Sequence, residues 1–394
     1  MTAGRPLRIV RVATVPFFLL HHLSRQIGDT VQAGHDVLLV TSPMEGIGTL
    51  RQLPGVRVEA VSIPRPIALG GDLRALWQLN RLFRRERPDV VHSTTPKAGL
   101  LCAIAAWTAR VPVRLHTFTG QAWAGRTVVV RLIGRLADRL IIALDTATYA
   151  DSASQCAFLE QQGVAPSGRV TVLGAGSLAG VDLQRMDRSR VAAASTLART
   201  RLGLAPSDPV IVFVGRVTRD KGVVELVQAF AQLRDVLPRL NLVLVGPFEP
   251  ELDPLPDDTR AMIEADPRIH AVGYDPDPAP WLALADLLCL PSYREGFGNV
   301  VIEAAALGVP TVGTDIPGLR DAVVDGETGV LVPAKDATAL AAALRALLAD
   351  PARRADMGAA AQRRARERFD ARVVNALVLA EYGRLLAGRR RPSR

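Results

Sequence analysis

Short apolar segments alternate with longer amphipathic segments along most of the 394-residue chain. The apolar segments have the length of buried strands, whereas the amphipathic segments repeat with the period of a helix. In the first half, the segments that predict strands are 8–14, 35–41, 56–62, 89–93, 112–117, 140–144 and 169–173. Those that predict helices are 18–33, 72–87, 96–109, 126–139 and 148–162. Strands and helices in this order predict a parallel, doubly wound sheet.

A segment rich in glycine and small residues, 174–182, interrupts this pattern and predicts a hinge. A polar, proline-rich excursion follows later, at 247–258. The second half predicts strands at 209–215, 241–246, 268–272, 286–290 and 309–313. It predicts helices at 222–236, 278–285, 299–307, 336–349, 351–367 and 370–387.

Two such halves predict an α/β protein with two Rossmann-like domains that face a cleft. We expect the first domain at 1–178 and the second at 179–370. A helix and a basic tail at 371–394 are expected to cross back to the first domain. Ligands of such sheets bind beyond the carboxyl ends of the strands, so candidate chemistry should follow the strand ends.

Charge is distributed unevenly. Residues 1–180 contain 20 Lys and Arg but 11 Asp and Glu, whereas the remainder contains 28 of each kind. Base bias in the gene explains why 45 of the 48 basic residues are arginine, but it does not explain a neutral second half. A basic first half indicates an anionic partner, either a membrane surface, a lipid phosphate or nucleic acid.

The three cysteines, Cys102, Cys156 and Cys289, are far apart and lie in apolar segments. They indicate buried small side chains rather than a disulfide framework or a zinc site, as expected in a reducing cytoplasm. No apolar run approaches the roughly 18–20 residues of a spanning helix. The apolar N-terminus contains Arg8 and Arg11, which favours a first core strand over a signal peptide.

Candidate binding and catalytic residues are most concentrated in residues 291–332. A glycine-rich loop there contains Glu295, and a helix capped by Asn299 follows and contains Glu303 one turn inside. Glycines let backbone N–H groups approach a ligand, and the helix N-terminus favours negative charge, so the segment suits a phosphate. The two carboxylates suit hydroxyls of a sugar and a ribose. The residues alone indicate a nucleotide or phospho-sugar site, against the alternative of two ordinary glutamates.

Two further turns follow strands of the second half. Arg216 and Lys221 lie in the loop 214–222 before a helix, where two cations suit a diphosphate, although a solvated basic loop has the same pattern. The turn 272–278 contains Asp275 and Asp277, which form an Asp-x-Asp pattern. Prolines beside these aspartates indicate a turn rather than a metal site.

The segment 291–332 resembles the Glu-x7-Glu motif of the retaining GT-B glycosyltransferases of family four. The resemblance implies that Glu295 contacts the transferred sugar and that Glu303 binds the ribose. It implies that Arg216 and Lys221 bind the donor diphosphate, and that no metal cofactor is needed. The remaining donor contacts that it implies are Gly273 and Tyr274 beside the base, and Gly296, Phe297, Gly298, Asn299 and Val300 against the sugar and diphosphate.

In the first half, Lys97 lies in the first turn of a helix just after a strand, which suits an acceptor phosphate or a capped helix with a solvated lysine. The resembled family often has a histidine in the loop after the next strand. By spacing this place falls on Thr119, whereas His116 lies on the strand and is typical of a core histidine. We expect the acceptor to contact Lys97, Thr119, Gly120 and Gln121, with Thr119 as the catalytic contact.

Two apolar segments of the first half bear on lipid contact. The loop 13–22 has Pro16, Phe17 and Phe18 where many relatives have glycines, and it could line the cleft or touch lipid. The helix 126–139 places Arg131, Arg135 and Arg139 opposite Val, Leu and Ile side chains. That arginine face could lie on anionic lipid, or the helix could be an ordinary amphipathic helix with a solvated face.

The segments TPKAG, TGQ and PSYREGFGNVVIEA resemble enzymes that extend polyprenyl-diphosphate-linked glycans or lipopolysaccharide with sugars from UDP donors. The resemblance implies transfer of a hexose or N-acetylhexosamine with retention, at the cytoplasmic face of the inner membrane. The first domain would bind the acceptor and the second the donor. One alternative is a GT-B sugar-nucleotide epimerase. A nucleic-acid-binding module is disfavoured, because the chain has no aromatic stacking platform and no basic recognition helix.

Overall fold

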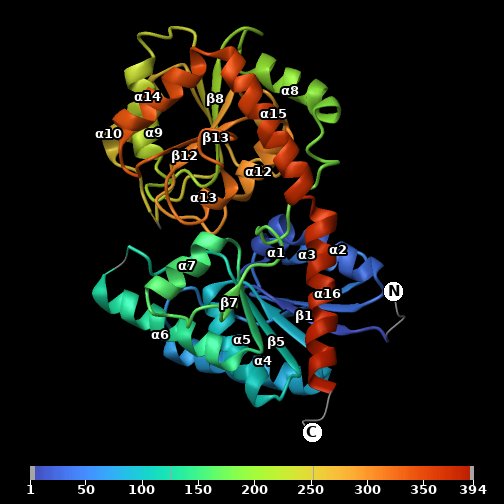
Figure 1. Ribbon diagram of the computed structural model, residues 1–394. Helices are drawn as coiled ribbons and strands as arrows, with labels where there is room; N and C mark the ends of the chain where they lie inside the picture. Colours follow the sequence, from blue (N-terminus) through green and yellow to red (C-terminus); the bar gives the residue numbers. More distant parts are fainter. Residues whose placement is uncertain (1–4, 126, 252, 391–394) are drawn as a thin grey trace. The chain divides into compact units, whose positions relative to one another are not determined.

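The computed structural model describes residues 5–125, 127–251 and 253–390, and it divides into two compact units. The first unit comprises Met1–Gly180 and Ala371–Arg394, and the second comprises Val181–Asp370. Each unit has a parallel sheet with helices packed on it (Figure 1). The expected fold class, with two Rossmann-like α/β units, is therefore confirmed.

The first unit contains a seven-stranded parallel sheet in the order β3-β2-β1-β4-β5-β6-β7. Its strands are β1 (Arg8–Val12), β2 (Asp36–Thr41), β3 (Val56–Ala60), β4 (Val90–Ser93), β5 (Val113–Phe118), β6 (Ala147–Ala150) and β7 (Val170–Thr171). Its helices are α1 (Pro16–His22), α2 (Ser24–Gln32), α3 (Ile47–Arg51), α4 (Leu69–Glu86), α5 (Pro96–Thr108), α6 (Val128–Leu144), α7 (Ala153–Gln161) and α16 (Ala371–Arg390).

Helices cover both faces of this sheet. Val10 and Val12 of β1 pack with α4 and α5 on one face, whereas Ile9 packs with the C-terminal helix α16 on the other. Figure 1 shows α4, α5 and α6 on the side of the sheet opposite α16. Successive residues of a strand point to opposite faces, which is why strands covered on both faces are largely apolar rather than alternating.

The second unit contains a six-stranded parallel sheet in the order β10-β9-β8-β11-β12-β13. Its strands are β8 (Val210–Val214), β9 (Asn241–Val245), β10 (Ile269–Gly273), β11 (Leu287–Leu290), β12 (Thr311–Thr314) and β13 (Gly329–Val332). Its helices are α8 (Arg188–Arg201), α9 (Val223–Leu233), α10 (Asp257–Ala265), α11 (Ala279–Ala283), α12 (Asn299–Ala306), α13 (Leu319–Ala322), α14 (Ala337–Leu348) and α15 (Pro351–Arg368).

Several expected elements of the first half are wrong. The strand predicted at 140–144 is the last part of α6, and the next strand, β6, occupies the start of the helix predicted at 148–162. The helix predicted at 18–33 consists of α1 and α2, which meet at Leu23. The apolar loop predicted at 13–22 is largely α1, because Pro16 starts a helix at its first position.

The pattern also missed elements that are short or polar. These are α3, α8, α10, α13 and β13, of which α10 begins inside the predicted excursion 247–258. Residue 126, where one helix was predicted to start, residue 252 of the excursion, and residues 1–4 and 391–394 lie outside the described residues. Across the described ranges, none of the helices combines the length and apolar character that crossing a membrane requires.

Candidate functional site

A topological switch point lies between β8 and β11 in the second unit. These strands are neighbours in the sheet, but the chain proceeds from β8 toward β9 on one side and from β11 toward β12 on the other. Connections that leave neighbouring strands in opposite directions mark the place at the carboxyl edge where open α/β sheets bind ligands. The predicted donor residues Arg216 and Lys221 follow β8, and Glu295 follows β11.

The backbones around this switch point are closely packed. Gly222, with φ +70°, caps α9, and a Cβ there would lie 2.0 Å from the Pro291 carbonyl oxygen after β11. Gly246, with φ +144° after β9, would place a Cβ 1.8 Å from the Gly215 carbonyl oxygen after β8. Only glycine allows both the approach and the backbone angle, so these two positions fix the loops against each other.

Lys221 and Glu295 form an ion pair between the two loops. Lys221 Nζ donates to Glu295 Oε1 at 2.5 Å, and Ser292 Oγ donates to the same oxygen at 2.8 Å. The two charged side chains keep only 17% and 14% of their surface exposed. The structure thus brings these two predicted residues together and places a cation and a carboxylate side by side at the switch point.

Arg216 lies among carboxylates. Its guanidinium donates to Glu249 at 2.8 Å and to Asp220 at 3.4 Å, and Arg294 also donates to Asp220, at 2.9 Å. Burial alone would lower the pKa of Arg216, but the hydrogen bond to Glu249 and the nearby negative charges raise it overall. Sequence reasoning missed Asp220, Glu249 and Arg294, because their pairing depends on the fold.

A tight turn connects Glu295 to α12. Gly298 caps this helix with φ +83°, so the prediction that Asn299 is the cap is wrong, and Asn299 is instead the first helical residue. Phe297 is buried and packs edge-on against Phe369, with ring centroids 5.2 Å apart. The predicted residues Gly296 and Val300 complete the same turn and the first turn of α12.

Glu303 lies one turn inside α12, as predicted. Burial raises the pKa of its carboxyl, and the Arg185 guanidinium opposes that rise. Arg185 also donates to the Asp277 carboxylate at 2.9 Å and to the Pro276 carbonyl at 2.7 Å. Arg185 therefore connects Glu303 to the turn after β10, and sequence reasoning did not find it.

That turn contains the predicted base contacts. Gly273 ends β10 with φ +76°, and Tyr274 after it is half exposed. Asp275 accepts hydrogen bonds from the Asp277 backbone N–H and from Trp281 Nε1, both at 2.8 Å. Asp275 therefore has the hydrogen bonds of a turn residue.

The first unit has its own switch point, between β1 and β4. The Thr14 and Thr95 hydroxyls after these strands lie 2.7 Å apart. Lys97 lies in the first turn of α5, as predicted, and donates to both carboxylate oxygens of Asp72 on α4, at 2.8 and 2.7 Å. Asp72 was not found from the sequence.

The other predicted acceptor residues lie in the loop after β5. Thr119 Oγ1 donates to the Thr94 carbonyl at 3.2 Å, which joins this loop to the one after β4. Gly120 has φ +103°, and the buried Gln121 amide lies 2.8 Å from the Gln155 amide of α7. Thr119 is thus near the loop that contains Lys97, whereas Gln121 is held in the protein interior.

His116 belongs to the core of the first unit. It is buried, and its Nδ1 lies 2.9 Å from the Ser93 hydroxyl. A Cβ at Gly99 of α5 would lie 2.4 Å from its ring, so the helix is pressed against the imidazole. Burial lowers the pKa of His116 to about 3, so the ring is neutral.

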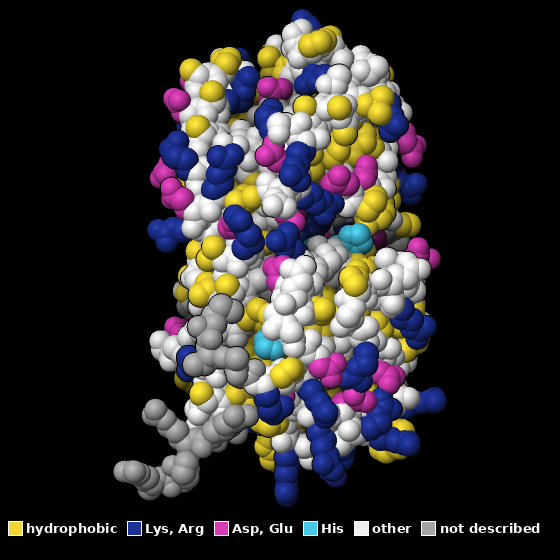
Figure 2. Space-filling view, turned by 90° about the vertical axis from the view of Figure 1, so that its right-hand side faces the viewer, with side chains coloured by type: hydrophobic (Ala, Val, Ile, Leu, Met, Phe, Trp, Pro, Cys, Tyr) yellow, Lys and Arg dark blue, Asp and Glu magenta, His cyan; other side chains and the backbone are white. Residues whose placement is uncertain are grey.

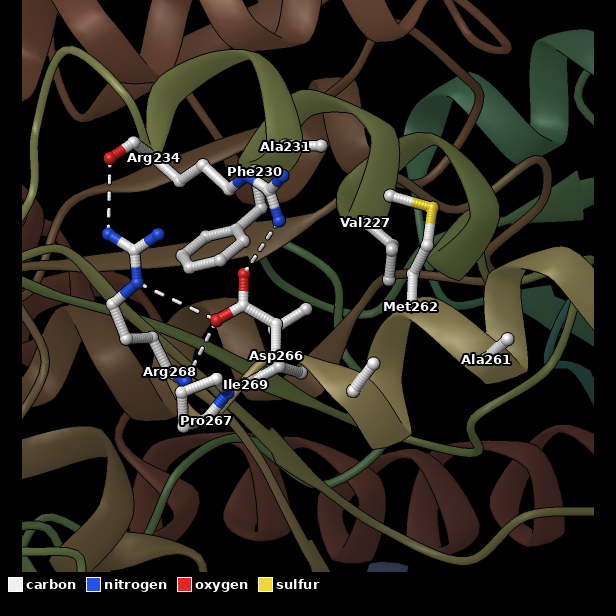
Figure 3. Close-up of a pocket in the computed structure, with 11 residues that line it drawn as sticks. Val227, Phe230, Ala231, Arg234, Ala261, Met262, Asp266, Pro267, Arg268 and Ile269 are labelled. Atoms are coloured by element: carbon white, nitrogen blue, oxygen red, sulfur yellow. Dashed lines mark hydrogen bonds and ion pairs between the residues drawn. The ribbon is translucent and has the colours of Figure 1, made fainter.

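A cavity of about 510 Å³ lies between α9 and α10 (Figure 3). Phe230 and Met262 line it, and Asp266 accepts from Arg234 at 3.2 Å beside Arg268. Arg268 precedes β10, whereas Arg234 follows α9, so the cavity lies at the amino edge of the sheet. Ligands bind this type of sheet at the opposite edge, and the loops of Lys221 and Glu295 therefore remain the candidate site.

Comparison with known proteins agrees with this architecture. The family model described as glycosyl transferases group 1 matches residues 195–364, and the glycosyl transferase 4-like domain model matches residues 21–176. The fold is shared with the crystal structure of Anabaena HepE in complex with UDP and glucose, with a TM-score of 0.78 and 20% identity over 96% of this chain and 99% of that chain. The fold is that of the GT-B glycosyltransferases.

Two curated relatives are similar to this chain over most of their length. The capsular polysaccharide biosynthesis glycosyltransferase CapM of Staphylococcus aureus is 30% identical over 325 residues, which cover 82% of this chain and 84% of CapM. D-inositol 3-phosphate glycosyltransferase 1 of Catenulispora acidiphila is 32% identical over 84% of this chain and 81% of its own. The chain therefore belongs to the group 1 glycosyltransferase family and is a glycosyltransferase.

Proposed function

We propose that this enzyme transfers a hexose or N-acetylhexosamine from a UDP-sugar to a lipid-linked glycan or lipopolysaccharide acceptor, with retention of anomeric configuration. The reaction would take place at the cytoplasmic face of the inner membrane. The paired Lys221 and Glu295 at the switch point of the second unit are the main support. The name of CapM, which places that relative in polysaccharide biosynthesis, and the UDP in HepE support the acceptor and donor classes.

The donor diphosphate would bind between the two loops of the second unit. Arg216 and Lys221 supply cations, and the turn from Gly296 to Val300 supplies backbone N–H groups at the start of α12. Both cations are paired with carboxylates, Arg216 with Glu249 and Lys221 with Glu295. The diphosphate would therefore exchange for part of these ion pairs, which keeps the cations positioned before the donor arrives.

The nucleoside would lie beside α12 and the turn after β10. Glu303 would accept hydrogen bonds from the ribose hydroxyls, and Gly273 and Tyr274 would flank the base. Arg185 supports this arrangement, because its positive charge opposes the rise in the pKa of Glu303 and its guanidinium donates to Asp277 in the turn after β10. This placement would assign the donor to the second domain and the acceptor to the first, as the sequence proposes.

The acceptor would use the carboxyl edge of the first unit. Lys97 at the start of α5 would meet an acceptor phosphate, with Thr119, Gly120 and Gln121 in the neighbouring loop. The first unit contains 26 Lys and Arg against 12 Asp and Glu, whereas the second contains 22 against 27. Long basic side chains project from the lower part of the face in Figure 2, which belongs to the first unit. This charge suits an acceptor with phosphate groups.

Negative charge grows on the departing diphosphate as the anomeric bond breaks. Arg216, Lys221 and the N-terminus of α12 would stabilise that charge more in the transition state than in the bound donor. Glu295 would hold the transferred sugar. Retention would follow from front-face transfer, in which the leaving phosphate takes the proton of the acceptor hydroxyl.

Steady-state kinetics of Glu295→Gln and Lys221→Ala tests this assignment. The substrates are a UDP-sugar and a polyprenyl-diphosphate-linked sugar. Each variant loses a charge-assisted hydrogen bond of about 1.5–3 kcal/mol, so we expect kcat/KM to fall by roughly 10–150-fold. The exposed residues Glu264 and Arg239 provide control variants, Glu264→Gln and Arg239→Gln, which should stay within about twofold of wild type.

Two outcomes would oppose the proposal. Near wild-type turnover in both site variants would show that the donor binds elsewhere. Consumption of the UDP-sugar at the same rate with and without an acceptor would indicate rearrangement or hydrolysis of the donor, as expected of an epimerase rather than a transferase.

A further inference from the structure

Helix α6 exposes its apolar residues to solvent. Seven Val, Leu and Ile side chains on it are between 40% and 70% exposed, namely Val128, Val129, Val130, Leu132, Ile133, Leu136 and Leu140. The residues it buries are Asp138, Ile141 and Ile142 near its C-terminal end. The sequence placed Arg131, Arg135 and Arg139 on one face opposite the apolar residues, either on anionic lipid or as the solvated face of an ordinary amphipathic helix. Over the first three turns the apolar side chains themselves are exposed, so the second alternative is wrong there.

Two of the three arginines of that predicted face are engaged within the fold. The Arg135 guanidinium donates to the Gln162 carbonyl, and Arg139 donates to the Gly163 carbonyl at 2.6 Å. These carbonyls follow α7, so Arg135 and Arg139 attach α6 to its neighbouring helix. The apolar residues, with Arg131 among them, therefore form the outer surface of α6.

A second apolar surface lies on α4. Ile67 just before the helix, and Leu69, Leu73 and Trp77 on it, are between 61% and 78% exposed. The three helical residues are four apart, so they form one stripe. The Arg81 guanidinium lies 5.5 Å from the centre of the Trp77 ring and continues the stripe with a cation.

Both surfaces begin at the same edge of the sheet. Helices α4, α5 and α6 each start beyond the carboxyl end of the preceding strand, and α5 packs between the other two. Leu69 of α4 and Val128 of α6 therefore lie on either side of the first turn of α5, which contains Lys97. Lys97 itself is bound to Asp72, one turn into α4.

The exposed charges of these segments have one sign. In residues 61–84 and 127–144, every exposed charged side chain is an arginine, namely Arg65, Arg74, Arg81, Arg84, Arg131 and Arg139. The two acidic residues there are not exposed, since Asp72 pairs with Lys97 and the buried Asp138 accepts from Trp123 Nε1 at 2.7 Å. An apolar surface among arginines matches the interface of an anionic bilayer.

We propose that the exposed apolar side chains of α4 and α6 insert into an anionic lipid surface and hold the carboxyl edge of the first unit against it. This inference rests on the proposed function and extends it, because a lipid-anchored acceptor would then present its phosphate to Lys97 from the bilayer. A second copy of the chain is a poorer occupant. A symmetric dimer would set each surface against itself, and its arginines would meet arginines without exposed carboxylates.

Vesicle flotation of the full chain tests the proposal. The vesicles are equal mixtures of phosphatidylglycerol and phosphatidylcholine, or phosphatidylcholine alone. Two double variants make the surfaces polar, Leu69→Gln/Leu73→Gln on α4 and Leu132→Gln/Leu136→Gln on α6. The matched control, Leu197→Gln/Val236→Gln, removes two apolar side chains of the second unit that are 51% and 52% exposed.

We expect the wild-type chain and the control to float with the anionic vesicles and to bind phosphatidylcholine alone more weakly. Each surface variant should lose at least about tenfold in partition, because apolar insertion and charge attraction act together. All variants should keep the wild-type Tm, since the replaced side chains are exposed. Transfer to a detergent-dispersed acceptor should persist in the surface variants.

The proposal is overturned if the wild-type chain does not bind anionic vesicles, or if the surface variants bind them as well as the control does. It is also overturned if size-exclusion chromatography shows a dimer that the surface variants lose, because a second copy would then cover the surfaces. Vesicle binding with no transfer by the wild-type chain to any acceptor would contradict the proposed function but would still support the proposed membrane-binding surface.

Discussion

Single residues at the switch point of the second unit leave little room for change. Gly222 combines φ +70° with a Cβ position 2.0 Å from the Pro291 carbonyl oxygen. Gly203, at the end of α8, has a similar φ of +68° but nothing within 4 Å of its Cβ position. A comparison of substitutions at these two glycines therefore separates the cost of a left-handed backbone from the cost of close packing.

We expect Gly203→Ala to lower the free energy of unfolding by about 1–2 kcal/mol, the cost of a left-handed residue with a side chain. Gly222→Ala should lower the free energy of unfolding by this amount and by about 1–3 kcal/mol more, because the loop after β8 must also move away from Pro291. Urea denaturation followed by circular dichroism measures both values. Equal losses in the two variants would show that the approach of these loops is not tightly constrained.

Asp151, just after β6, gives the first unit a pH dependence. The carboxyl is buried, and within the described ranges its Oδ1 has no hydrogen-bond partner. Burial raises its pKa to about 8, from the ordinary value of 3.8. The folded state therefore holds this proton where the unfolded state has lost it, and stability falls as the pH rises from about 4 to 8.

An asparagine has the shape of the protonated carboxyl but cannot ionise. We expect Asp151→Asn to match the wild-type Tm near pH 4 and to exceed it by at least about 2 °C at pH 8. Thermal unfolding at pH 4, 6 and 8 measures the difference. A difference that does not grow with pH would show that Asp151 is ionised in the folded protein.

Among the site residues, the sequence was sufficient where position depends on local spacing, as for Glu303 one turn inside α12. The sequence placed Lys221 and Glu295 each in a loop after a strand, but only the sheet order, with β8 beside β11, brings the two side chains together. The partners of Arg216 could not be predicted either, because Glu249 follows β9 and only the folded sheet brings it near. The cap of α12 was misplaced by one residue, since the left-handed backbone of Gly298 outweighed the usual preference for asparagine.

Among the elements, α6 shows where hydrophobic patterning fails. Residues 140–144 form a short apolar run, and such a run fits a buried strand and a buried helix equally well. Tertiary packing decides in favour of the helix, because Ile141 and Ile142 join the core against Phe118 of β5. Elsewhere the alternation of strands and helices was sufficient to predict two parallel sheets.

The C-terminal helix α16 completes the core of the first unit. Val378 and Tyr382 pack with Ile9, Val90 and Leu115 from the central strands. Tyr382 is also polar at its tip, where its hydroxyl accepts from Arg11 at 2.8 Å and lies 2.7 Å from His92 Nδ1. The helix is therefore a structural part of the first unit, although it follows the second unit in the chain.

Two valines on α16 test this packing. Val378 is 4% exposed and Val373 is 52% exposed. We expect Val378→Ala to lower the free energy of unfolding by about 2 kcal/mol through lost burial and an unfilled space, whereas Val373→Ala should cost less than about 0.5 kcal/mol. Chemical denaturation of the full chain compares them. Similar losses would mean that α16 is not docked on the sheet as described.

The two units of the molecule differ in their candidate site residues and in their charge. The second unit, with its paired cations and glycine turn, has the features of a nucleotide site, and the first has the excess of arginine. The sequence showed this asymmetry, but it could not show that the apolar residues of α6 are exposed. That exposure depends on which face packs on α5 and α7.

In the proposed donor site, Lys221 at the switch point of the second unit binds the diphosphate of a UDP-sugar. Thermal unfolding with UDP, GDP or ADP at 100 times the dissociation constant for UDP tests this role of Lys221, since a ligand at that level stabilises by about 2.7 kcal/mol. We predict that UDP raises the Tm of the wild-type chain and of Arg239→Gln more than GDP or ADP does. The Lys221→Ala variant should lose most of this rise. An equal rise with UDP in Lys221→Ala and wild type, or no rise in either, would show that Lys221 does not bind the donor at this switch point.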